Sequence, residues 1–174
     1  MQKPKFKRIA VKIGSNVLAG KDGFLDQVCM HNIVNQVAGL KEQGVQVVLI
    51  SSGAVASGRA SFPVDTHIDT VSARQLWSAI GQVKLMNTYS ELFEKYQLFC
   101  AQVLATKESF IDRRHYLNMK NCISTLLENN VVPIVNENDT IAVTELMFTD
   151  NAELSGLISS MMDCDALLIL SNVD

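Results

Sequence analysis

Short apolar runs rich in β-branched residues alternate along this chain with stretches of helical periodicity. The runs are Ile9 to Ile13, Val45 to Ile50, Phe99 to Leu104, Val131 to Val135 and Ala166 to Leu170. Runs of this kind predict strands buried within a sheet, and the stretches between them predict helices that each bury one face. Alternating strands and helices joined by right-handed crossovers form a mostly parallel sheet covered on both faces. The pattern therefore predicts an α/β fold, a three-layer α/β/α sandwich.

Several residues mark the expected helix boundaries. Asp26 and Asp112 are expected to cap helix N-termini, and Gly44 is expected to end the first long helix. Ser72 and Gln75 form a capping-box pattern. They predict the start of a further long helix at Ser72.

The helical stretch from Ser72 to Tyr96 has more apolar residues than one face needs for the core of its own chain. Surplus apolar surface of this kind is typical of a protein interface. We therefore expect this stretch to lie at a subunit contact in a homo-oligomer.

Composition limits the class of protein. With 174 residues, 48% of them hydrophobic, the chain is expected to form one domain. Its net charge of -3 argues against binding to nucleic acid, and no apolar run approaches the ~18 residues of a membrane span. The four cysteines are widely spaced and form no C-x-x-C pair, so we expect buried free thiols and a cytoplasmic protein.

In a doubly wound sheet, ligands bind beyond the carboxyl ends of the strands. After the first strand, Lys12 lies within an apolar run and is followed by the small residues Gly14 and Ser15. A lysine in such a run is either functional or belongs to an edge strand from which its ammonium reaches water. Both interpretations are open from the sequence.

Polar or small residues also follow the second and fourth strands. Ser51 to Gly58 lead directly into a helix, and this loop either admits a carboxylate or phosphate to the backbone or serves tight packing. It is not a Walker A loop. Asn136 to Asp139 place four hydrogen-bonding side chains at one strand exit, which suggests recognition of a polar, zwitterionic ligand. Thr149 to Asn151 open the helix from Ala152 to Met162, either as an N-cap or as part of the same site.

Four of these segments resemble, in order and spacing, the glutamate 5-kinase branch of the amino-acid kinase family. They are Val11 to Leu18, Ser51 to Gly58, Val135 to Asp139, and Asp150 with Asn151. The resemblance covers the whole chain, and the tetrad from Asn136 to Asp139 is its most specific part. It implies that residues 1–174 are the N-terminal, glutamate-binding part of an amino-acid kinase domain whose C-terminal nucleotide-binding part is absent.

The same resemblance implies an activity and its residues. The reaction is phosphorylation of the γ-carboxylate of L-glutamate by ATP, with Mg²⁺ neutralising the nucleotide phosphates, as the first step of proline biosynthesis. Lys12 would be catalytic and would stabilise negative charge on the transferred phosphoryl group. The residues implied at the nucleotide and phosphate end are Lys12, Gly14, Ser15, Ser171 and Asn172. Those implied for glutamate are Ser52, Gly53, Ala54, Asn136, Asp139, Asp150 and Asn151.

The chain departs from the family pattern at three positions and in length. Ala152 stands where the family usually has a second aspartate, and Ser171-Asn172 replaces Thr-Asp. Family members continue well past the length of this chain with a second catalytic lysine, so we expect a fragment or an incomplete gene product. The alternative is a truncated, non-catalytic module of the same fold that binds an amino acid or acts by oligomerisation.

Overall fold

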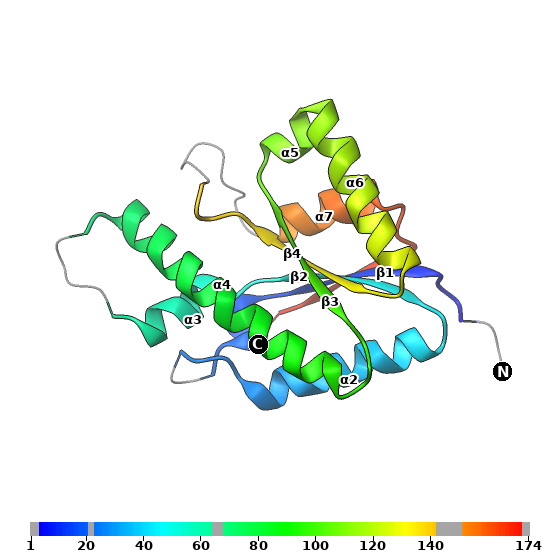
Figure 1. The fold of residues 1–174 in the computed structure, drawn as a ribbon, viewed down its shortest axis with the longest axis horizontal. Coiled ribbons are helices and arrows are strands. Elements are labelled where there is room, and N and C mark those ends of the chain that lie inside the picture. The colour runs from blue at the N-terminus through cyan, green and yellow to red at the C-terminus, as the bar shows by residue number, and fades with distance from the viewer. Residues whose placement is uncertain (1–3, 21–22, 64–67, 142–150, 172–174) are drawn as a thin grey trace.

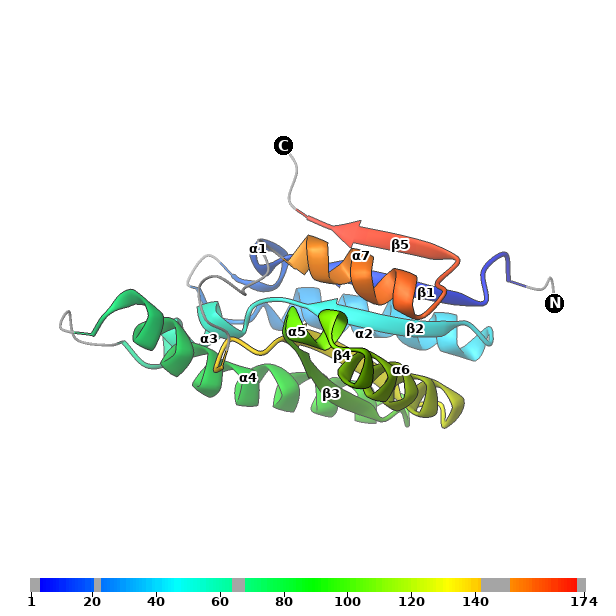
Figure 2. The same cartoon turned by 90° about the horizontal axis from the view of Figure 1, so that it is seen from above.

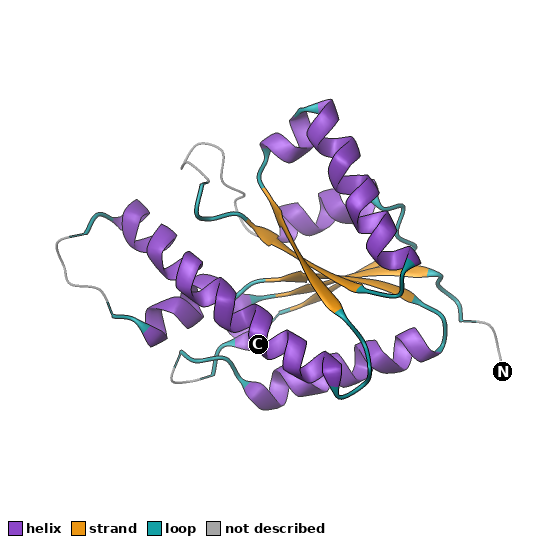
Figure 3. Ribbon diagram, in the orientation of Figure 1, coloured by secondary structure: helices purple, strands orange, loops and turns teal. Residues whose placement is uncertain are grey.

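The computed structural model describes residues 4–20, 23–63, 68–141 and 151–171, which form a five-stranded sheet with helices around it (Figures 1 and 3). The strands are β1 (Arg8–Ile13), β2 (Gln46–Ser51), β3 (Cys100–Ala105), β4 (Val132–Glu137) and β5 (Ala166–Leu170). Their order in the sheet is β3-β4-β2-β1-β5, and every neighbouring pair is parallel. The predicted α/β class is confirmed.

The helices cover both faces of the sheet, as Figure 2 shows. They are α1 (Ser15–Leu18), α2 (Gln27–Glu42), α3 (Ala54–Ser61), α4 (Thr70–Glu94), α5 (Glu108–Ile111), α6 (Arg113–Glu128) and α7 (Asn151–Met161). The helices α2 and α4 pack on one face, and α6 and α7 pack on the other. None of the helices in the described residues is long and apolar enough to cross a membrane.

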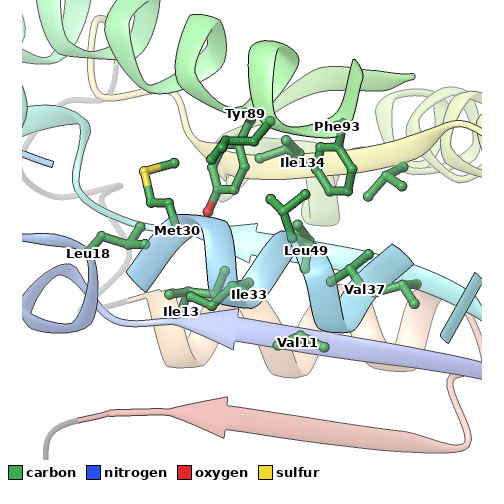
Figure 4. Packing of buried hydrophobic residues seen from close by; sticks show 14 of the residues in the cluster. Val11, Ile13, Leu18, Met30, Ile33, Val37, Leu49, Tyr89, Phe93 and Ile134 are labelled. Atoms are coloured by element: carbon green, nitrogen blue, oxygen red, sulfur yellow. The ribbon is translucent and has the colours of Figure 1, made fainter. Parts of the chain in front are cut away.

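The core between the sheet and the α2–α4 layer contains the two largest fully buried side chains, Tyr89 and Phe93 of α4 (Figure 4). Their rings stack with centroids 6.3 Å apart. Burial raises the pKa of the Tyr89 hydroxyl well above its usual value, and this hydroxyl lies 2.9 Å from Ser51 Oγ at the end of β2. A neutral, hydrogen-bonded phenol can be buried without an unmatched polar group.

The expected caps of α2 and α6 are confirmed. The side chain of Asp26 accepts a hydrogen bond from Cys29 N at 2.9 Å, and Asp112 accepts from the backbone N–H groups of Arg114 and His115. Gly44, just after α2, has a φ of 82°, which glycine adopts without steric cost.

The expected start of α4 at Ser72 is wrong. The helix begins at Thr70, and its N-cap is Asp69, whose Oδ1 accepts hydrogen bonds from Val71 N and Ser72 N, each at 3.0 Å. The hydroxyl of Ser72 donates to Asp69 Oδ2 at 2.6 Å, inside the first turn. A carboxylate can satisfy several free N–H groups at once, so Asp69 is the better cap.

All four cysteines are free, as predicted, but none is fully buried. Cys122 is exposed, and the other three are partly covered. Burial still raises the pKa of the Cys29, Cys100 and Cys164 thiols, which keeps them protonated near neutral pH.

The helices α3 and α4 meet backbone to backbone. A Cβ atom on Gly81 would lie 1.7 Å from Ala54 O, and one on Gly58 would lie 1.9 Å from Trp77 O. Only glycine permits this approach. It brings the start of α3, and with it the loop after β2, against the middle of α4.

Candidate amino-acid and phosphate site

The candidate residues lie where the neighbouring strands β1, β2 and β4 end. Ser52 N, just beyond β2, donates to Ile13 O of β1 at 3.1 Å, and Gly14 N donates to Leu170 O of β5 at 3.0 Å. The exits of β1, β2 and β5 are therefore tied together by backbone hydrogen bonds. Carboxyl ends of parallel strands are the usual place for a ligand in this class of fold.

Lys12 is partly buried and lies inside the sheet. Its register partners are Ile50 of β2 and Ile169 of β5, so β1 is flanked on both sides and Lys12 is not on an edge strand. Since strand side chains alternate between faces, Lys12 shares the face of Ala10, which packs in the α6–α7 core. A lysine held in this position needs a partner or a function.

Gly14 leaves open the space beside the ammonium of Lys12. A Cβ atom on Gly14 would lie 3.7 Å from Lys12 Nζ and 3.3 Å from Leu170 O. The N–H of Gly14 already donates to Leu170 O, so it is not free to bind a phosphate. Gly14 would aid phosphate binding only by leaving space where a side chain would lie. The hydroxyl of the exposed Ser15 remains as a donor beside it.

Tight packing is one of the two roles that the sequence suggested for the loop after β2, and ligand binding there stays a prediction. Gly53 adopts a left-handed φ of 101°, and the buried Ala54 begins α3 against Gly81 of α4, so tight packing accounts for two of its residues. Ser52 is only partly buried, and its Oγ accepts a hydrogen bond from Asn151 Nδ2 at 2.7 Å. This hydroxyl belongs to a polar network that packing does not require.

Asn151 joins the loop after β2 to the end of β4. Its Nδ2 lies 2.7 Å from Ser52 Oγ and 3.1 Å from Asn136 Oδ1, with Ser51 O at 3.5 Å. Asn136 Oδ1 also accepts from Glu137 N at 2.9 Å. Three segments that are far apart in the sequence thus converge through two amide side chains.

Asp139 is 6% exposed and pairs with Arg74 of α4. Its Oδ1 accepts from Arg74 Nη2 at 2.8 Å and from Nε at 3.1 Å, and the carboxylate of Glu137 lies 3.6 Å from the same Nη2. A buried carboxylate needs a cation, and the guanidinium supplies it. Oδ2 of Asp139 has only Ser78 Oγ at 3.5 Å among the described residues, so it can accept a further donor such as an ammonium.

The contribution of α4 is the part of the site that the sequence did not predict. Arg74, Ser78 and Gln82 are spaced by four residues, so they share one face of the helix. Two of them contact Asp139 and the third contacts Asn136. A polar stripe within an apolar helix was the available signal, but the surplus of apolar residues pointed to an interface instead.

Two of the expected residues, Asp150 and Asn172, lie outside the described residues. Ser171 is exposed and follows Leu170, whose carbonyl is bound to Gly14 N, so it lies beside the turn after β1. Within the described residues, no group of three or more His, Cys, Asp or Glu side chains is arranged to hold a metal ion.

Comparison with known proteins matches the family model of the amino acid kinase family over residues 7–174. The chain is 61% identical to a glutamate 5-kinase of Bacteroides thetaiotaomicron, with 99% of this chain and 48% of the relative covered. It is 50% identical to a glutamate 5-kinase of Chlorobaculum tepidum, again over 99% and 48%, and 41% identical to one of Citrifermentans bemidjiense over 98% and 46%. The chain thus spans about half the length of these curated relatives. The match of the family model over nearly all of its length shows that the chain belongs to the amino acid kinase family.

Proposed function

We propose that this chain is the glutamate-binding part of an enzyme that transfers the γ-phosphoryl group of ATP to the γ-carboxylate of L-glutamate. The product would be γ-glutamyl phosphate, and the reaction would be the first step of proline biosynthesis. The observation that carries the proposal is the position of Asn151, whose Nδ2 bonds both Ser52 Oγ and Asn136 Oδ1. Relatives named glutamate 5-kinase match the chain over nearly all of its length.

The charges of the site suggest how glutamate would lie. The ammonium of glutamate would donate to Oδ2 of Asp139. This oxygen has only a long contact, 3.5 Å, with the hydroxyl of Ser78 among the described residues. Asn136, Asn151 and the segment around Asp150 would hold the α-groups. The γ-carboxylate would extend along Ser52, Gly53 and Ala54 toward Lys12.

Lys12 would act on the phosphoryl group during transfer. The transition state of phosphoryl transfer is loose and spreads negative charge over the transferred oxygens, so positioning and a fixed cation account for most of the catalysis. The γ-carboxylate has a solution pKa of about 4.3 and is already ionised at neutral pH, so the nucleophile needs no general base.

The phosphate end of the site fits a nucleotide in part. The ammonium of Lys12, the space beside Gly14 and the hydroxyls of Ser15 and Ser171 would face the phosphates, with Asn172 next in the chain. ATP would supply the phosphoryl group, and Mg²⁺ would bind the phosphate oxygens and neutralise their charge. We place this enzyme in the cytoplasm, with no nucleic-acid or membrane partner.

Two measurements test the proposal. Calorimetry on this chain should show binding of L-glutamate and much weaker binding of L-glutamine, whose neutral amide lacks the negative charge that would face Lys12. The full-length protein should form γ-glutamyl hydroxamate from glutamate and hydroxylamine only when ATP and Mg²⁺ are present. Binding without any turnover in the full-length protein would favour a non-catalytic amino-acid-binding module instead.

A further inference from the structure

Gln82 lies in the middle of α4 and is 8% exposed. Its Oε1 accepts a hydrogen bond from Asn136 Nδ2 at 3.0 Å, at the end of β4. Its Nε2 is buried and has no hydrogen-bond partner among the residues that the structure describes. A buried donor without a partner destabilises the folded state. The amide of Gln82 is therefore poorly explained by stability alone.

The acceptor atom of Gln82 determines which way the amide of Asn136 faces. An asparagine amide has one accepting end and one donating end. Asn136 Oδ1 accepts from Asn151 Nδ2 at 3.1 Å and from Glu137 N at 2.9 Å, which requires Nδ2 to point away from both. Gln82 Oε1 accepts a hydrogen bond from this Nδ2. A reversed Gln82 amide would place two donors against each other.

The orientation continues from Asn136 to the loop after β2. Asn136 Oδ1 accepts a hydrogen bond from Asn151 Nδ2, and this orients the amide of Asn151. In this orientation the same Nδ2 donates to Ser52 Oγ at 2.7 Å. Gln82, Asn136, Asn151 and Ser52 thus form one chain of hydrogen bonds across α4, β4, α7 and the loop after β2. A reversal of any one of the three amides would place like ends of two amides against each other.

We propose that Gln82 is a positioning residue of the glutamate site, because its amide oxygen fixes the orientation of Asn136 and, through it, of Asn151 and Ser52. This inference rests on the proposed function for the identity of the ligand. Gln82 acts through Asn136 and is not assigned a contact with the substrate.

Gln82→Met tests the proposal, because methionine fills a similar volume without a strong acceptor. The variant loses the unpartnered N–H of Gln82 but leaves Asn136 Nδ2 without its acceptor, and these changes oppose each other in stability. We expect the urea midpoint to change little while the calorimetric Kd for glutamate rises about 10-fold or more, the effect of one misaligned hydrogen-bonding group. In the full-length protein, the KM for glutamate should rise while the KM for ATP stays near its original value.

A structural readout without ligand separates this proposal from the proposed function. The side-chain amide resonances of Asn136 and Asn151 should shift in Gln82→Met and return toward their original positions in Gln82→Glu, which retains an oxygen acceptor. Gln75→Met is the matched control, since Gln75 is partly buried in the same helix and, within the described residues, has no hydrogen bond to the strand exits.

The outcomes are distinct. Failure of the unaltered chain to bind glutamate would refute the proposed function, and the amide resonances would still decide whether Gln82 orients Asn136. Unshifted resonances in Gln82→Met would overturn the positioning role. An unchanged Kd in a protein that binds glutamate, or an equal loss in Gln75→Met, would overturn it as well.

Discussion

Gly81→Ala should open the contact between α3 and α4, and the structure sets the scale of the effect. The added Cβ would lie 1.7 Å from Ala54 O and 2.6 Å from Gly58 N, both of which are backbone atoms. Ordinary contacts between carbon atoms lie at about 3.5–4.0 Å, so the helices must move apart by more than an ångström. No rotamer change can relieve a clash between a Cβ and the backbone of a neighbouring helix.

The expected loss is at least ~3 kcal/mol in the free energy of unfolding, the upper part of the range for overpacked cores. A domain of this size has about 5–15 kcal/mol in total, so the loss is a large fraction. Gly156→Ala provides the control, because Gly156 lies within α7 and its added Cβ would meet no atom of the described residues within 4 Å. Alanine there should stabilise the protein by ~0.5–1 kcal/mol through helix propensity.

Urea denaturation followed by circular dichroism would measure both variants. Trp77, the single tryptophan, lies at the same contact and donates from Nε1 to Phe62 O at 2.9 Å, so its fluorescence reports local separation of α3 from α4. If Gly81→Ala were as stable as Gly156→Ala and left Trp77 fluorescence unchanged, the backbone contact described above would be wrong.

Four further predictions concern the site, the assembly and one helix cap. Asp139→Ala should abolish glutamate binding in calorimetry, and unchanged binding would place the ammonium elsewhere. In the full-length protein, Lys12→Ala should lower kcat by about two to four orders of magnitude with a much smaller change in the KM for glutamate, since Lys12 would act on transition-state charge; near-normal kcat would make Lys12 structural. Light scattering should show an oligomer that Val83→Glu disrupts, because Val83 is 61% exposed within α4; a monomer at tens of micromolar would contradict the predicted interface. The hydrogen bond from the backbone N–H of His115 lowers the pKa of Asp112 in the folded state. The cap therefore stabilises α6 at pH values above the unfolded pKa of about 3.9, and this stabilisation is lost as the pH falls. The free energies of unfolding of the unaltered chain and of Asp112→Ala should converge in acid, and a difference that stays constant with pH would show that the ionised cap is not its cause.

The composition of the site was only partly predictable from the sequence. Lys12, Ser52 and Asn136 could be predicted because each follows or interrupts an apolar run, and parallel strands bring such exits to one edge. Asn151 was predicted from its place at the start of a helix. The structure places Ser52, Asn136 and Asn151 in one network, while their binding of glutamate stays a prediction. Asp150 and Asn172 stay predictions as well.

The sequence by itself determined the alternation of elements, the parallel sheet and the caps at Asp26 and Asp112, because these depend on periodicity and on chemistry within a few residues. Only the tertiary structure showed that α4 supplies Arg74 and Gln82 to the end of β4. Arg74 lies 65 residues from its partner Asp139, and Gln82 lies 54 residues from its partner Asn136. Both contacts depend on how closely α4 approaches the loop after β2. That approach is set by Gly58 and Gly81, whose lack of a side chain has meaning only once the two helices are placed against each other.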